Sequence, residues 1–204
     1  MVDAVSPDVL VVQGTDAGGH GLECGAGLVA LLPEVVDVLG RSNERPVLMA
    51  AGGISNATGA LASLVLGAEG VCMGTRFLAS PEANISEGYR REVLRAGDGG
   101  QTTRRTKVYD NLRGTVGWGK THNARGILNR SYWDHVGGMS EEENKRLYKE
   151  EMGKGDEGWG EDRRMTAYAG SGVGLVKEVK GAGDIVREIR EGVRDLAGGV
   201  KALL

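Results

Sequence analysis

Aromatic residues are scarce in this sequence of 204 residues. They make up 4% of it, phenylalanine occurs once, and no aromatic side chain precedes Phe77. The first third is therefore built largely from small and aliphatic residues, a composition typical of β-strands covered by helices. Only two cysteines are present, Cys24 and Cys72, so we expect a reducing, cytoplasmic location rather than a disulfide scaffold. Cys72 falls in a predicted buried strand, where we expect an inert thiol.

Long apolar runs and an excess of positive charge are also missing. No run approaches the ~20 residues of a membrane-spanning helix, and the first residues lack the basic start of a secretory signal. The net charge is −3 and the pI about 5.7, so nothing favours binding to nucleic acid or to a membrane surface. Three histidines without zinc-motif spacing predict no metal site.

Glycine, by contrast, is abundant, with 35 residues, and it follows short apolar runs. These runs predict strands at 9–13, 47–51 and 70–73, and apolar spacing predicts helices at 28–39 and 56–66. The order βαβαβ indicates a parallel sheet whose glycine turns all emerge at the carboxyl edge. Uncovered backbone N–H groups beside a helix N-terminus favour an anion, most often a phosphate. The alternative is that these glycines only make tight turns.

The remainder of the chain is less regular. We expect a helix at 81–95, a loop at 96–105, strand or irregular structure at 108–118, and a short helix within 121–135. Ser140 and Glu143 form a capping box, which predicts a charged helix ending near Met152. Apolar residues at helical spacing between 175 and 196 predict one or two closing helices. The expected organisation is βα units at 1–80, a helical and loop excursion at 81–165, and closing helices of the same domain at 166–204.

His20 is the sharpest candidate for chemistry. It lies in the glycine loop 14–21 after the first strand, where an imidazole can accept a proton from carbon or oxygen near neutral pH. The alternative is a loop histidine bonded to backbone. Asp16 either orients His20 or serves as a turn acid. Gln13 ends the first strand and directs its amide to the same rim, and Thr75 adds a hydroxyl there. The glycines at 170–174 lack the strand and the last glycine of a dinucleotide fingerprint.

Three motifs in order resemble the nitronate monooxygenase family. They are VVQGTDAGGHG (11–21), PVLMAAGGIS (46–55) and GVCMGTRFLAS (70–80), and YAGSGVGLVKEV (168–179) is similar to the tail of that family. The resemblance implies an FMN-containing (β/α)₈ barrel that oxidises alkyl nitronates, such as propionate 3-nitronate, with O₂ and without a nicotinamide. It implies that His20 is the catalytic base, and that Gln13 and Gly18 approach the flavin. It also implies that the FMN phosphate is held by Gly52, Gly53, Met73, Gly74 and Thr75.

The sequence departs from that family in its number of strands. A full barrel has eight strands and about 250 residues, whereas only three barrel-type strands are evident here. We therefore expect a partial TIM (β/α)₈ barrel, a truncated form whose open sheet edge pairs with a second copy or a partner chain. Two alternatives to a nitronate monooxygenase stay open. One is a related FMN-dependent enoyl-acyl-carrier-protein reductase, and the other is a non-catalytic half-barrel that needs a partner chain.

Overall fold

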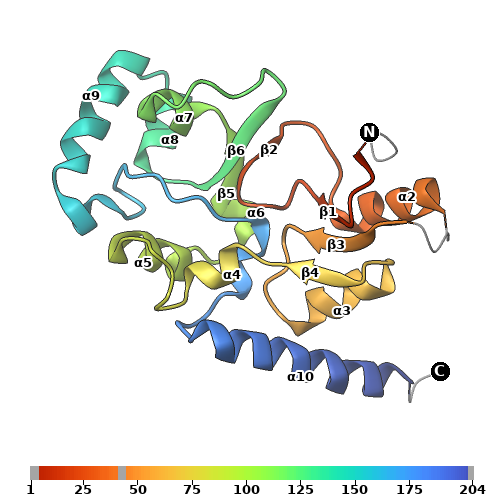
Figure 1. The fold of residues 1–204 in the computed structure, drawn as a ribbon. Helices are drawn as coiled ribbons and strands as arrows, with labels where there is room; N and C mark the ends of the chain where they lie inside the picture. Colours follow the sequence, from red (N-terminus) through yellow and green to blue (C-terminus); the bar gives the residue numbers. More distant parts are fainter. Residues whose placement is uncertain (1–4, 41–44, 202–204) are drawn as a thin grey trace.

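Three parallel strands form the first of two sheets among the described residues (Figure 1). The strands are β1 (Val9–Gln13), β3 (Val47–Ala51) and β4 (Gly70–Cys72), in the order β1-β3-β4. The computed structural model describes residues 5–40 and 45–201. Helices α2 (Leu28–Leu39) and α3 (Ala57–Val65) connect the strands. The predicted βαβαβ order is thus confirmed, and Asn56 caps α3 by accepting a hydrogen bond from the Gly59 N–H group at 2.9 Å.

The register of the sheet brings the three strand ends level with one another. Gln13 pairs with Ala51, and Ala51 pairs with Cys72. Because the strands are parallel, the loops that follow them emerge at the same edge. This edge carries the glycine turns that the sequence singled out.

Helices cover one face of the sheet. Val12, Leu48 and Ala50 are buried between the sheet and α2, α3 and α10 (Ala182–Lys201). Helix α10 packs along α3 (Figure 1). The buried members of this core are Val12, Leu28, Leu32, Leu48, Ala50, Ile54, Ala60, Ala68, Ile185 and Ile189.

The opposite face of the sheet is exposed. Val9 and Val11 retain 49% and 50% of their accessible surface, and Cys72 is also exposed. The prediction of a buried strand residue at Cys72 is therefore wrong, because the helices lie on one side of the sheet only. Among the described residues, β1 and β4 are the outer strands, each paired on one side.

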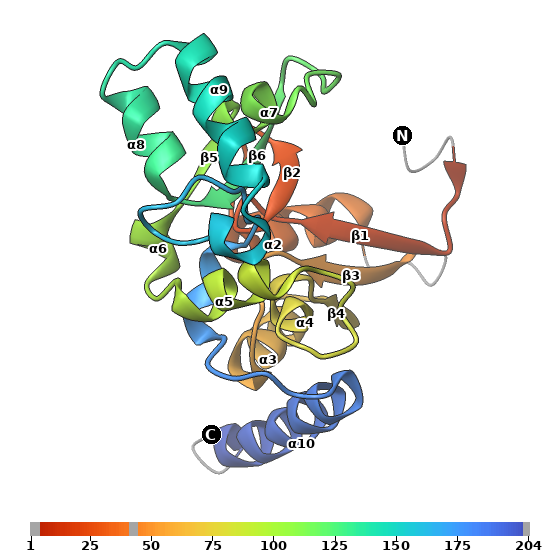
Figure 2. The ribbon, with the colours of Figure 1, turned by 90° about the vertical axis from the view of Figure 1, so that its left-hand side faces the viewer.

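A second, antiparallel sheet stands beside the carboxyl edge of the first (Figure 2). Its strands are β2 (Gly19–Leu22), β5 (Thr103–Thr106) and β6 (His122–Ile127), in the order β2-β6-β5. The sequence predicted loops at β2 and β5, and both predictions are wrong. The short helix predicted within 121–135 is present as α8 (Arg130–Val136), but strand β6 before it was missed. The sequences TRRT and HNARGI lack the alternation of a half-buried strand, so their pairing depends on contacts across the fold.

Short helices complete the structure. They are α4 (Thr75–Leu78), α5 (Glu87–Arg95), α6 (Gly99–Thr102), α7 (Val108–Arg113), α8 (Arg130–Val136), α9 (Glu141–Met152), and the 3₁₀ helices η1 (Gly155–Gly158) and η2 (Ser171–Leu175). The capping box is confirmed in part, since Ser140 Oγ accepts from the Glu143 N–H group at 3.2 Å. The prediction for 108–118 missed α7. The division at residues 80 and 165 stays a prediction.

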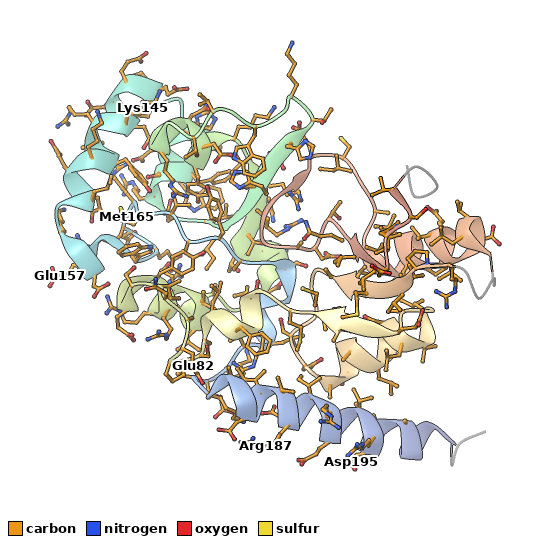
Figure 3. The ribbon with its side chains drawn as sticks, in the orientation of Figure 1. Glu82, Lys145, Glu157, Met165, Arg187 and Asp195 are labelled. Carbon is orange, nitrogen blue, oxygen red and sulfur yellow. The ribbon has the colours of Figure 1, made fainter. Side chains whose placement is uncertain are left out.

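Charged side chains cover the outer face of helix α10. Arg187 and Asp195 are exposed on α10 (Figure 3). Within the described parts of the chain, every helix is too short or too polar to cross a membrane.

Candidate active site

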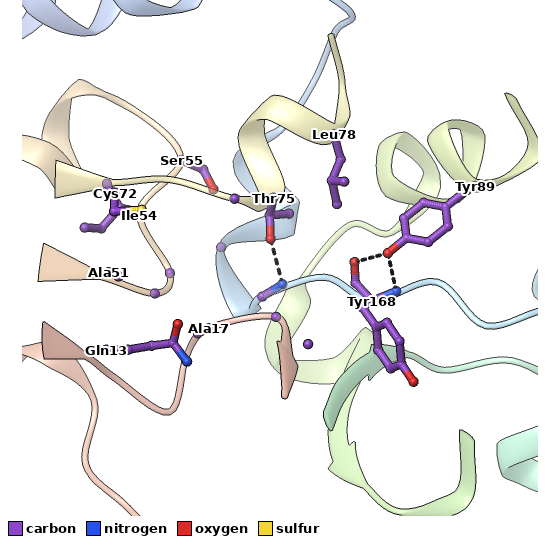
Figure 4. Close-up of a pocket in the computed structure, with 17 residues that line it drawn as sticks. Gln13, Ala17, Ala51, Ile54, Ser55, Cys72, Thr75, Leu78, Tyr89 and Tyr168 are labelled. Atoms are coloured by element: carbon purple, nitrogen blue, oxygen red, sulfur yellow. Dashed lines mark hydrogen bonds between the residues drawn. The ribbon is translucent and has the colours of Figure 1, made fainter. Parts of the chain in front are cut away.

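A cavity of about 330 Å³ opens at the carboxyl edge of the parallel sheet (Figure 4). Six of the eight site residues expected from the sequence line it, namely Gln13, Gly18, Gly52, Gly53, Gly74 and Thr75. Met73 instead packs against the core beneath the sheet. His20 is outside the lining, although its neighbour Gly19 belongs to it. The structure thus gathers most of the predicted site around one hollow, while the roles of these residues stay predictions.

The turn after β3 requires glycine at two positions. Gly52 and Gly53 have φ angles of +106° and +74°, values that L side chains rarely adopt. A Cβ on Gly52 would also lie 3.0 Å from the Ala17 backbone nitrogen, and one on Gly53 would lie 2.9 Å from Asp16 Cβ. The turn after β3 is therefore in close contact with the glycine loop after β1, and backbone atoms form this wall of the cavity.

Backbone donors give the cavity its polarity. Within residues 5–40 and 45–201, no acceptor is found for the N–H groups of Gly53, Gly74 and Thr75. None of the described residues that line the cavity is Lys, Arg, Asp or Glu. Thr75 Oγ1 accepts from the Gly170 N–H group at 2.9 Å (Figure 4), which leaves its hydroxyl proton free to donate. The cavity is thus a neutral site rich in donors, suited to an anion held by backbone amides.

The segment 170–172 closes the cavity, and its role was missed from the sequence. Gly170 and Gly172 line the hollow, and a Cβ on Gly172 would come within 2.3 Å of Gly53 O. Ser171 Oγ donates to Asp16 Oδ1 at 2.8 Å. Asp16 therefore ties this segment to the glycine loop, and the idea that it orients His20 is wrong. The glycine cluster itself was the signal, because close backbone packing requires it.

Two tyrosines stand at the far end of the cavity. Tyr89 Oη donates to Tyr168 O and accepts from the Tyr168 N–H group, both at 2.7 Å (Figure 4). Burial raises the pKa of Tyr89 to about 12. Burial, and then the nearby charge of Asp110, raises the pKa of Tyr168 to about 12. Both hydroxyls are therefore neutral near pH 7.

His20 lies in β2 beside the cavity and is bonded to a carboxylate. Its Nε2 is 2.9 Å from Asp110 Oδ1 and 3.0 Å from Oδ2. Trp118 stacks on the ring, with centroids 3.8 Å apart and planes 10° apart, and the Tyr168 ring lies at 5.5 Å. The alternative of a side chain bonded to backbone is therefore wrong for His20. Asp110 and Trp118 were missed, since they come from a stretch without motif or periodicity.

Gln13 lies between the cavity and β2. Its side chain points across the carboxyl edge (Figure 4), and Nε2 is 3.5 Å from His20 O. This contact is long for a hydrogen bond, so the amide is available to a ligand. The position agrees with the expectation that the strand-end amide faces the rim.

The fold places the chain among α/β proteins of TIM-barrel-like architecture. It superposes on FabK from Thermotoga maritima with a TM-score of 0.75 at 23% identity, covering 100% of this chain and 60% of that one. A nitroalkane oxidase from Streptomyces ansochromogenes gives a TM-score of 0.74 at 24% identity, covering 98% and 55%. At these identities the similarity shows the fold alone.

Sequence comparison gives the family. The nitronate monooxygenase family model matches residues 1–192. Nitronate monooxygenase npaC of Metarhizium robertsii is 50% identical over 202 residues, covering 98% of this chain and 56% of npaC. A nitronate monooxygenase of Neurospora crassa is 42% identical over 190 residues, covering 92% and 49%. The chain belongs to the nitronate monooxygenase family, and it spans about half the length of these relatives.

Proposed function

We propose that this chain carries the FMN-binding and proton-accepting part of a nitronate monooxygenase, which oxidises alkyl nitronates with O₂. The observation that supports the proposal most is the level register of β1, β3 and β4. It gathers three glycine turns around one cavity, with His20 beside it. Family membership, and relatives named nitronate monooxygenase, support the substrate class.

The cavity suits the phosphate end of FMN. Apart from its two chain neighbours, no atom of the described residues lies within 4 Å of a Cβ placed on Gly74, so the backbone here faces open space that a ligand can fill. The N–H groups of Gly53, Gly74 and Thr75 would hold the phosphate oxygens, and the Thr75 hydroxyl would donate to one more. Gln13 would present its amide to the polar edge of the flavin ring.

His20 accounts for the proton step. On a neutral nitroalkane, His20 takes the proton from the carbon next to the nitro group, and the bonding electron pair moves into the nitro group to give the nitronate. A substrate supplied as the nitronate has already lost this proton. Bound FMN supplies the electron-transfer chemistry and the reaction with O₂.

Retention of FMN and nitronate-dependent O₂ uptake together test the proposal. The purified chain should keep a flavin spectrum through gel filtration after incubation with FMN, and should then consume O₂ with a nitronate. NADH consumption without response to nitronates would favour the enoyl reductase alternative. Failure to retain FMN would contradict the flavin site.

We also propose that the outer strands β1 and β4 pair with further strands of a second copy or a partner chain. The exposed face of the parallel sheet would then line the interior of the completed barrel. The exposed Val9 and Val11 side chains support this, since they would face a barrel interior. Light scattering on the purified chain tests it. A monomer at all concentrations, with FMN bound, would contradict the proposal.

A further inference from the structure

Asp110 is the carboxylate that contacts His20. It lies in α7, 90 residues along the chain from His20, and its side chain retains only 6% of its accessible surface. Both carboxylate oxygens lie within 3.0 Å of His20 Nε2. Burial of a carboxylate is costly unless its oxygens are hydrogen-bonded, so this side chain is held in place by its partners.

Three neighbours fix the orientation of Asp110. Thr115 Oγ1 donates to Oδ1 at 2.8 Å and Tyr168 Oη donates to Oδ1 at 3.3 Å. The Thr115 N–H group also donates to Asp110 O at 3.0 Å. Tyr109, the preceding residue, is fully buried and donates to Ile127 O at 2.6 Å, which fixes α7 against β6. The carboxylate therefore cannot easily turn away from His20.

We propose that Asp110 is the positioning residue of His20, and that it keeps the ring proton on Nε2 so that Nδ1 is the basic atom. An ionised carboxylate only accepts hydrogen bonds, so a neutral His20 that faces it carries its proton on Nε2. The lone pair is then on Nδ1, and the proton from the nitroalkane carbon ends there. The catalytic part rests on the proposed function, whereas the tautomer does not.

The other ionisable groups near His20 leave this assignment unchanged. Tyr168 is neutral near pH 7, since its pKa is about 12. The Arg113 guanidinium lies over the Tyr168 ring, 5.5 Å from its centroid. Arg105 and Arg125 lie on the opposite face of the antiparallel sheet, since Arg125 pairs with Gly19 and Ala124 pairs with His20. Both donate to Thr15 O instead.

An Asp110→Asn variant gives a sharp consequence. Thr115 and Tyr168 both donate to Oδ1, so the amide oxygen of Asn should take that position. The amide NH₂ group would then take the place of Oδ2 and donate to His20 Nε2. The ring would have to accept at Nε2 and carry its proton on Nδ1, which removes the lone pair from the basic atom. In serine proteases, replacing the aspartate that contacts the catalytic histidine by asparagine likewise gives the wrong histidine tautomer and lowers kcat.

The tautomer can be measured without flavin. Long-range ¹H–¹⁵N NMR spectra of the flavin-free chain at about pH 8 separate the two neutral tautomers, and His20→Ala assigns the His20 signals. The wild type should show a proton on Nε2, and Asp110→Asn should show it on Nδ1. Asp134→Asn is the matched control, because Asp134 is a comparably covered carboxylate paired with Arg164 and Arg130, away from His20. A wild-type proton on Nδ1, or an unchanged tautomer in folded Asp110→Asn, would overturn the assignment.

Kinetics on the flavin-loaded protein test the consequence for proton transfer. Asp110→Asn should lower kcat/KM for a neutral nitroalkane about 10²- to 10⁴-fold and change that for the preformed nitronate far less. Asp110→Glu should restore part of the loss. The double variant with His20→Ala should be no slower than His20→Ala alone, because the two residues act as a unit. Equal loss on both substrates would refute the positioning role. The expected tautomers without nitronate turnover would instead refute the proposed function and leave the assignment intact.

Discussion

Gly74→Ala isolates the proposed phosphate site from the stability of the fold. Gly74 has φ −99° and ψ −65°, a conformation open to any residue. Beyond its two chain neighbours, a Cβ there would meet no described residue within 4 Å. The protein should therefore fold as well as the wild type, or gain about 0.4–1 kcal/mol through its unfolded state. The added methyl group would occupy the space where the phosphate meets the backbone.

The expected loss of FMN affinity follows from the hydrogen bonds removed. A hydrogen bond to a charged group contributes about 1.5–3 kcal/mol, so losing one of them weakens FMN binding roughly 10- to 150-fold. Riboflavin has no phosphate and should bind the variant as it binds the wild type. Quenching of flavin fluorescence on titration with each ligand measures both dissociation constants.

A second glycine-to-alanine variant tests whether a loss of FMN binding is specific to the proposed phosphate site. Gly97→Ala also adds a Cβ that meets nothing within 4 Å, but Gly97 is outside the cavity lining, so both flavins should bind unchanged. Unaltered FMN binding in Gly74→Ala, or an equal loss of FMN and riboflavin, would refute the location of the phosphate.

Three further predictions concern the base, the β3 turn and the tyrosine pair. His20→Ala should slow turnover of neutral nitroalkanes about 10²- to 10⁴-fold and that of nitronates much less, as O₂ uptake would show; equal losses would refute its role as base. Gly53→Val should destabilise the chain by about 1–3 kcal/mol, since a branched residue is strained at φ +74°, and should release FMN, so an unchanged Tm with stoichiometric flavin would contradict the turn. Tyr89→Phe should cost about 1–3 kcal/mol of unfolding free energy at pH 7, because it leaves Tyr168 N–H and C=O without their partner. The pKa of Tyr89 is raised from 10.0 to about 12, so its stabilisation is complete below pH 10 and is lost as pH rises through about 12. Urea unfolding across this range should show a weaker alkaline loss in the variant, and identical curves would contradict the assignment.

Local patterns were sufficient for the parallel half of the fold. The apolar runs at β1, β3 and β4 and the glycines after them specified strands, turns and the edge at which the turns meet. Asn56 and Ser140 marked helix starts that the structure contains. These features are encoded within a few residues, because strand period, glycine φ angles and capping bonds are local properties.

The antiparallel sheet and the partner of His20 were beyond local patterns. Strands β5 and β6 are polar and do not alternate, and they become strands by pairing with each other and with β2. Exposure of Val9, Val11 and Cys72 likewise depends on which face the helices cover. Sequence spacing cannot supply such information.

The sequence by itself determined the family motifs and the glycine turns, and it singled out His20 as the candidate base, a role that stays a prediction. Only the tertiary structure decided that residues 170–172 close the cavity and that Asp110 and Trp118 surround the His20 ring. The reason is separation along the chain. Asp110 reaches His20 because Tyr109 fixes α7 against β6, and β6 pairs with β2, so the contact exists only once both long-range pairings have formed.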